Sequence, residues 1–144
     1  VAGGFEEHCF NGVVRSYNSD GQLQKWTGRA GTWSVTRDTD PSTGAPRKVI
    51  QDPAGRRTTY QYDDFFFKLA SITDSGGRQT QFVFDEFDGS NLIQVTGPEL
   101  CVTELGYDVQ HRLTSWTTPE QECTTYAYDA EGRVTGIEAP QGGV

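Results

Sequence analysis

Pairs of an aromatic residue followed by aspartate recur along this 144-residue chain at a nearly constant interval. Successive pairs are 22, 23 and 21 residues apart: Tyr62-Asp63, Phe84-Asp85, Tyr107-Asp108 and Tyr128-Asp129. Repetition at such a period is typical of arrays in which each copy is one small structural unit that buries its apolar side against its neighbours. With the weaker copies 17-YNSDGQL-23 and 33-WSVTRD-38, the chain is predicted to contain about six copies.

Each copy alternates large and small or polar residues around the pair, as in 60-YQYD-63 and 126-YAYD-129. This period of two is typical of a strand with one buried face. A second apolar stretch follows, such as 69-LASIT-73 or 134-VTGIE-138, and ends at a segment rich in Pro or Gly. We therefore predict an all-β fold: a continuous, curled antiparallel sheet of successive β-hairpins, with no substantial helix.

The copies differ in how well they keep the pattern. Residues 46–144 carry it clearly, residues 12–45 form degenerate copies, and residues 1–11 form an N-terminal extension or edge strand. We expect residues 1–144 to form a single repeat domain.

The aspartates have a chemical reason to recur. An aspartate side chain accepts hydrogen bonds from backbone N–H groups two or more residues ahead, and a following glycine supplies the positive φ of a tight loop. The segment 128-YDAEGRV-134 has both features. The predicted turn residues are Asp63, Asp85, Asp108, Asp129 and Gly132.

These segments resemble the YD repeats of RHS-type proteins. The best matches are 52-DPAGRRTTYQYD-63 and the stretch 107–140, which ends in 126-YAYDAEGRVTGIEAP-140. The resemblance implies a sheet of hairpins that winds into a shell, which encloses a toxin in bacterial systems or forms part of an adhesion receptor in animals. The repeats themselves are not expected to catalyse a reaction.

Three consecutive phenylalanines depart from the turn pattern. Alignment of 62-YDDFFFK-68 with 128-YDAEGRV-134 places Phe66 or Phe67 at the glycine position and Lys68 at the arginine position, with one extra residue. Two roles stay open: an outward contact with a partner, or closure of the sheet's open end. The candidate interface is Phe65, Phe66, Phe67 and, one copy later, Phe87.

Enzymatic and metal-dependent functions are not expected. Recurring carboxylates at equivalent turn positions are what a structural repeat predicts, whereas a catalytic pair needs environments that separate its pKa values. Asp52 resembles a fragment of the family's self-cleavage signature, but the turn interpretation is favoured. The potential metal ligands lack local Cys-x-x-Cys or His-x-x-x-His spacing, so neither metal nor cofactor is predicted: His8, Cys9, Cys101, His111 and Cys123.

The formal charge of −8 argues against nucleic acid as a partner, since phosphate binding requires clustered Lys and Arg. The sequence contains no run of about 20 apolar residues, so membrane insertion is not predicted.

The cysteines occupy repeat-related places. Cys101 and Cys123 lie six and five residues before Tyr107 and Tyr128. An intrachain Cys101–Cys123 disulfide is predicted, with Cys9 left as a possible intermolecular thiol; two buried free thiols are the alternative.

We expect a noncatalytic structural protein located outside the cell or at its surface. The favoured function is a filament subunit that pairs head to tail with copies of itself through its sheet edges. One alternative is an excerpt of a larger RHS shell or receptor, paired with flanking repeats. Another is a carbohydrate-binding module with a glycan partner, for which Trp26, Trp33 and Trp116 are the candidates, although packing within the sheet explains them better.

Overall fold

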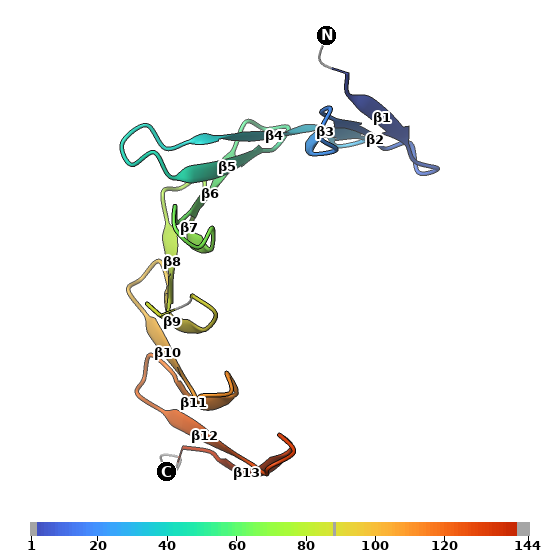
Figure 1. Ribbon diagram of the computed structural model, residues 1–144. Coiled ribbons are helices and arrows are strands. Elements are labelled where there is room, and N and C mark those ends of the chain that lie inside the picture. The colour runs from blue at the N-terminus through green and yellow to red at the C-terminus, as the bar shows by residue number, and fades with distance from the viewer. Residues whose placement is uncertain (1–2, 88, 141–144) are drawn as a thin grey trace. The chain divides into compact units, whose positions relative to one another are not determined.

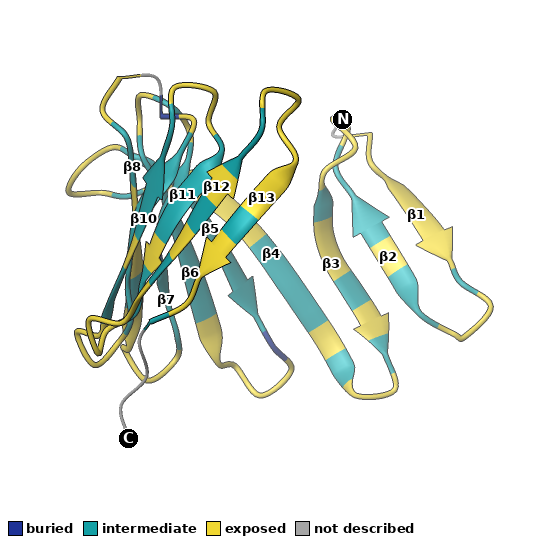
Figure 2. Cartoon of the chain, turned by 90° about the horizontal axis from the view of Figure 1, so that it is seen from below, coloured by how far each residue is buried: buried dark blue, intermediate teal, exposed yellow. Residues whose placement is uncertain are grey.

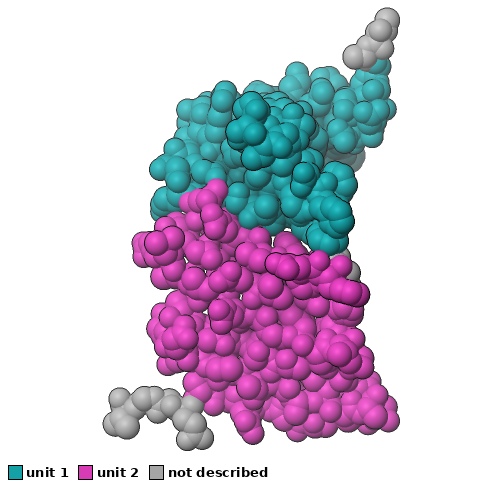
Figure 3. All heavy atoms as spheres, turned by 60° about the vertical axis from the view of Figure 1, so that its left-hand side comes forward, with its two compact units in different colours: residues 1–78 teal, residues 79–144 magenta. Residues whose placement is uncertain are grey.

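The computed structural model describes residues 3–87 and 89–140, and these residues form thirteen β-strands and no helix (Figure 1). The chain divides into two compact units, Val1–Arg78 and Gln79–Val144 (Figure 3). The first unit contains β1 Phe5–His8, β2 Val14–Tyr17, β3 Leu23–Gly28, β4 Gly31–Thr39, β5 Pro46–Gln51, β6 Arg57–Tyr62 and β7 Leu69–Thr73. The second contains β8 Gln79–Phe84, β9 Leu92–Thr96, β10 Val102–Tyr107, β11 Leu113–Thr117, β12 Cys123–Tyr128 and β13 Val134–Glu138.

Within each unit every strand pairs antiparallel with the strand that precedes or follows it in sequence. This order follows from the short connections, because a loop of a few residues can join only antiparallel neighbours. The predicted all-β fold of successive hairpins is confirmed. The described part of the chain contains no helix that is long and apolar enough to cross a membrane.

Strand register separates apolar from polar side chains. In the second unit Leu105 pairs with Trp116 across β10 and β11, and Tyr126 pairs with Ile137 across β12 and β13. The adjacent pair Gly106 and Ser115 points to the opposite face, since successive side chains alternate. One face of the sheet therefore collects aromatic and aliphatic side chains.

This apolar face is incompletely covered. Among the described residues no apolar side chain is buried, and most strand positions are half-buried or exposed (Figure 2). Ile137 is 63% exposed and Trp116 is 43% exposed. A single layer of sheet has no second layer to pack on, which explains the missing core.

The aromatic residue of each pair lies at a β-bulge. The register shifts between Gln61 and Tyr62 in β6, and it shifts in the same way immediately before the aromatic residue of four other strands: Tyr17, Phe84, Tyr107 and Tyr128. A bulge bends a strand and ends regular pairing. The repeat period therefore marks the point where each strand leaves the ladder and enters its aspartate turn.

Candidate functional site

The aspartate turns share one hydrogen-bond pattern. In the loop between β12 and β13, Oδ1 of Asp129 accepts the backbone N–H groups of Glu131 at 3.0 Å and Arg133 at 2.8 Å. Oδ2 accepts the Nε–H of Arg133 at 2.7 Å. Gly132 has φ 83°, a conformation that glycine adopts without steric penalty. The carboxylate thus organises the loop that closes the hairpin.

Asp52, Asp74 and Asp108 make the same three contacts with the residues two and four positions ahead. The Asp52 loop joins β5 to β6, and the Asp63 loop joins β6 to β7, so these two loops lie at opposite ends of β6. The turn motif is therefore present at both rims of the sheet. The turn at Asp74 was missed in the sequence, although 74-DSGGR-78 has the same Asp-x-x-Gly-Arg spacing as 129-DAEGR-133.

These contacts favour the ionised aspartates. The Arg133 guanidinium, followed by the Arg133 backbone N–H, holds the pKa of Asp129 below its usual value. At Asp52, which is 8% exposed, burial alone would raise the pKa, but the Arg56 guanidinium and the backbone N–H groups outweigh it, so the pKa is lowered. The pKa is lowered because hydrogen bonds donated to the carboxylate and the positive charge of the arginine both stabilise the ionised aspartate.

The phenylalanine loop keeps the aspartate contacts in a longer form. Asp63 accepts the backbone N–H groups of Phe65, Phe66 and Lys68. Phe67 adopts φ 55° and so occupies the place that glycine holds in the shorter loops. This left-handed conformation is strained for a bulky side chain.

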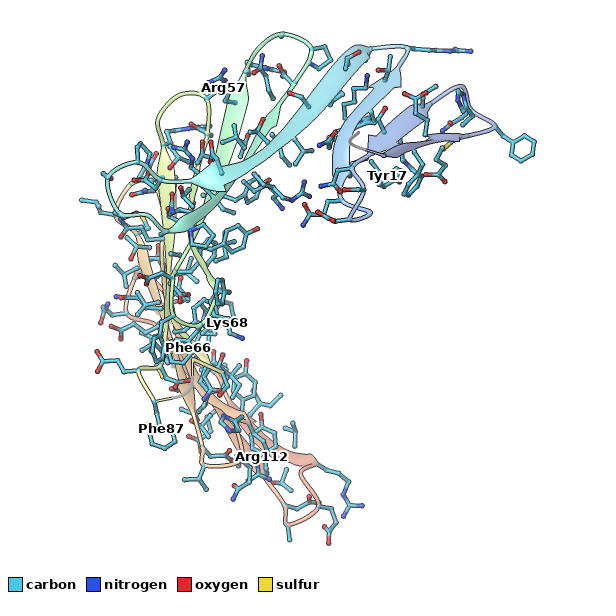
Figure 4. The ribbon with its side chains drawn as sticks, turned by 45° about the horizontal axis from the view of Figure 1, so that its top comes forward. Tyr17, Arg57, Phe66, Lys68, Phe87 and Arg112 are labelled. Atoms are coloured by element: carbon cyan, nitrogen blue, oxygen red, sulfur yellow. The ribbon has the colours of Figure 1, made fainter. Side chains whose placement is uncertain are left out.

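The three phenylalanines are not equivalent. Phe66 is half-buried and meets Phe65 edge to face, with ring centroids 4.7 Å apart (Figure 4). Phe65 and Phe67 are 79% and 69% exposed. The half-buried ring of Phe66 therefore agrees with a role in closing the loop, whereas the rings of Phe65 and Phe67 are accessible on the surface.

Phe87 lies in the next aromatic-Asp loop, in the second unit, and is 96% exposed (Figure 4). Its loop is organised by Asp85, which accepts the backbone N–H groups of Gly89 and Asn91 at 3.3 and 2.7 Å. An interface role for these phenylalanines stays a prediction.

His111 links two successive loops of the second unit. It adopts φ 60°, at the position that glycine holds in the Asp129 loop. Its Nδ1 lies 2.9 Å from the side-chain nitrogen of Asn91 and 3.1 Å from the hydroxyl of Ser90. This histidine therefore has a structural contact between repeats.

The predicted Cys101–Cys123 disulfide is not formed, because Cys9, Cys101 and Cys123 are all free thiols. Register gives the reason. Cys123 is the first residue of β12 and pairs with Thr117 of β11, which in turn pairs with Glu104 of β10. Cys101 lies in the loop directly before β10, so β11 separates the two cysteines. Two strand spacings are about 10 Å, beyond the roughly 7 Å that bridged Cα atoms allow. The alternative of buried thiols is also wrong, since Cys101 and Cys123 are exposed.

The tryptophans divide into a pair and a single residue. Trp26 and Trp33 pair across β3 and β4 and stack with ring centroids 5.3 Å apart, so each covers one face of the other. Trp26 and Trp33 are half-buried, whereas Trp116 is exposed. Across residues 3–87 and 89–140, no three His, Cys, Asp or Glu side chains lie close enough together to hold a metal ion.

Both ends of the strand order have open edges. Among the described strands β1 pairs only with β2, and β13 pairs only with β12. Each edge strand presents a row of backbone N–H and C=O groups that can accept another strand.

Comparison with known proteins identifies part of the chain. The model of the RHS repeat family matches residues 107–144, which include β11, β12 and β13. A search of curated proteins found no match. The resemblance to the RHS repeat family is therefore confirmed over residues 107–144.

Proposed function

We propose that this chain is a noncatalytic structural array of β-repeats that is extended at its edges by further strands. The observation that carries the proposal is the combination of open edges at β1 and β13 with a sheet whose described part buries no apolar side chain. Repeat units of this kind gain stability from neighbours that continue the sheet and cover its apolar face.

The carboxylates support a structural role. Asp52, Asp74, Asp108 and Asp129 each bind an arginine and two backbone N–H groups of their own loops. A carboxylate used in this way is not available as a proton donor or nucleophile. Catalysis is therefore not part of the proposed function.

The further strands have two possible sources. In an RHS-type shell or receptor they are flanking repeats of a longer chain. In a filament they are copies of this chain, and β13 of one copy pairs with β1 of the next. In the filament, contacts between the β13 edge of one copy and the β1 edge of the next add copies in one direction without closing. Either source fits a location outside the cell or at its surface, which the resemblance to RHS proteins implies.

Electron microscopy and sedimentation velocity of the purified chain test the proposal. A filament subunit gives regular polymers that grow with protein concentration, whereas flanking repeats leave a monomer or irregular aggregates. Ile137→Lys places a charge on edge strand β13 and is expected to shorten or abolish the polymers. Val109→Lys, at an exposed loop position, adds the same charge away from the edge and is the matched control. Monomers at every concentration for both the wild type and the control contradict the filament.

A further inference from the structure

The loop between β1 and β2 has the backbone of an aspartate turn without its aspartate. The N–H of Cys9 donates to the carbonyl of Val13 at 2.8 Å, and the N–H of Gly12 donates to the carbonyl of Cys9 at 3.0 Å. The loop between β12 and β13 closes with the same two bonds, at 2.9 and 3.1 Å. Cys9 and Val13 therefore stand where that loop has aspartate and arginine, and the carboxylate–arginine pair is replaced by a thiol and an aliphatic side chain.

Asn11 lies at the tip of this loop. It is exposed, and its neighbour Phe10 is fully exposed. The side-chain Oδ1 of Asn11 accepts the backbone N–H of Val13 at 3.1 Å, as in an Asx turn. Because Gly12 lies between these two residues, the hydrogen bond folds the amide of Asn11 over the Gly12 peptide. The same bond draws electron density toward Oδ1 and makes the amide carbon Cγ more electrophilic.

Gly12 gives this asparagine a neighbour that the others lack. The two other asparagines of the chain precede larger residues, in Asn18-Ser19 and Asn91-Leu92. Gly12 is exposed, and a Cβ atom placed on it would meet nothing within 4 Å. Without a side chain, its nitrogen is open to approach, and its backbone leaves φ 79° for other conformations at little cost.

One contact opposes attack by the Gly12 nitrogen, namely its hydrogen bond to the carbonyl of Cys9. This bond breaks when the end of the hairpin opens. Strand β1 pairs with β2 through four residue pairs, from Phe5↔Tyr17 to His8↔Val14, and has no second neighbour among the described strands. Edge hairpins of this kind open at a lower free energy than strands that are paired on both sides.

We propose that Asn11 is a site of spontaneous deamidation. The backbone nitrogen of Gly12 attacks Cγ of Asn11 and loses its proton to water, the bond from Cγ to Nδ2 breaks, and ammonia leaves a cyclic imide. Water then opens the imide at either carbonyl and gives aspartate or isoaspartate. Water is the only co-reactant, and no group is oxidised or reduced.

The isoaspartate product loosens strand β1. Its main chain runs through the side chain of residue 11 and is one atom longer, so the loop no longer matches the register that His8 and Val14 require. Each product also carries a new negative charge at the loop tip. The consequence for assembly rests on the proposed function, in which β1 is one of the two edges that accept further strands. Deamidation then removes that edge as the protein ages.

The test is peptide mapping by mass spectrometry of the full chain, aged at mildly alkaline pH either folded or in urea. Cleavage after Arg15 separates the peptides of Asn11 and Asn18. In the folded chain, Asn11 is expected to convert about tenfold or more faster than Asn18 or Asn91, since it alone precedes glycine. Asn18 is a close internal control, because its Oδ1 accepts the N–H of Asp20 in the same i to i+2 contact.

Equal conversion rates at Asn11 and Asn18 in the folded chain overturn the proposal. Rapid conversion of Asn11 in urea alone overturns it as well, because the hydrogen bond from Gly12 to Cys9 then protects the native loop.

Asn11→Gln keeps an amide at the loop tip but must close a larger ring, so it is expected to stay unmodified over the same period. Amide hydrogen exchange at low protein concentration compares the aged wild type with this variant. The amides of Phe5–His8 are expected to lose protection only in the aged wild type, while those of Arg57–Tyr62 do not change in either chain. Unchanged protection of β1 after full conversion contradicts the loosening of this edge. Both measurements use the unassembled chain, so their outcome does not depend on whether it forms filaments.

Discussion

The phenol of Tyr128 donates a 2.7 Å hydrogen bond to the backbone carbonyl of Leu113, which is the first residue of the preceding strand β11. The Arg112 guanidinium lies over the same ring, 4.8 Å from its centre, and donates to the carbonyl of Asp129 at 3.2 Å. The arginine of one aspartate turn thus packs on the aromatic-Asp pair of the next copy. This contact joins two successive copies of the repeat through Arg112 and Tyr128.

Tyr128→Phe is expected to lower the free energy of unfolding by about 1 kcal/mol, since it leaves the ring in place and removes one hydrogen bond. Tyr126→Phe is the matched control, because its hydroxyl makes no hydrogen bond with the residues that the structure describes, and it is expected to change stability by less than about 0.5 kcal/mol. Urea unfolding of both variants measures the difference. Equal stabilities rule out a contribution from the Tyr128 hydroxyl.

Phe67→Gly is expected to stabilise the chain by about 1 kcal/mol, because glycine adopts the left-handed conformation of this position without strain. Gly132→Ala makes the opposite change at the equivalent position of the last aspartate turn and is expected to destabilise by about 1 kcal/mol. Thermal or urea unfolding tests both variants. A loss of stability in Phe67→Gly means that the Phe67 side chain contributes more to folding than its conformation costs.

Phe66→Ser is expected to lower the free energy of unfolding by about 1–2 kcal/mol, since it removes a half-buried ring that contacts Phe65. Phe87→Ser replaces a ring that is almost fully exposed and is expected to change stability by less than about 0.5 kcal/mol while weakening any assembly that uses this loop. Urea unfolding and sedimentation separate the two effects. Loss of assembly without loss of stability in Phe66→Ser would instead assign that ring to a contact.

The stability of the chain is expected to fall in acid. The native pKa values of Asp52, Asp63, Asp74, Asp108 and Asp129 are all lowered, so folding favours their ionised forms. This stabilisation is fully present above the unfolded aspartate pKa of about 4 and is lost as pH falls through the lower native values.

Urea midpoints measured from about pH 6 down to about pH 2 follow this loss. Asp74→Asn removes one carboxylate whose charged form the native state stabilises. The free energy of unfolding is therefore expected to depend less steeply on pH in this variant. An unchanged pH profile in Asp74→Asn contradicts a role for the Asp74–Arg78 pair.

Much of the fold was predictable from sequence because the repeat sets it locally. The period of two and the aspartate turns define each hairpin, and short connections leave only antiparallel pairing between neighbours. Alignment with the Asp129 copy placed Phe66 or Phe67 at the glycine position, and the structure gives the left-handed conformation to Phe67.

Two features depend on distance through the sheet and were not predictable from spacing along the chain. Equivalent places in successive copies lie two strands apart, which is why the expected Cys101–Cys123 bond does not form. Periodicity identifies the apolar face of a strand but not whether anything covers it, so the exposure of Trp116 was not anticipated.

Amide hydrogen exchange at the edge strands tests the central claim most directly. If β1 and β13 pair with strands of further copies, the amides of Phe5–His8 and Val134–Glu138 gain protection as protein concentration rises, while those of Arg57–Tyr62, already paired on both sides, do not change. Edge amides that exchange equally fast at low and high concentration would contradict assembly through these edges.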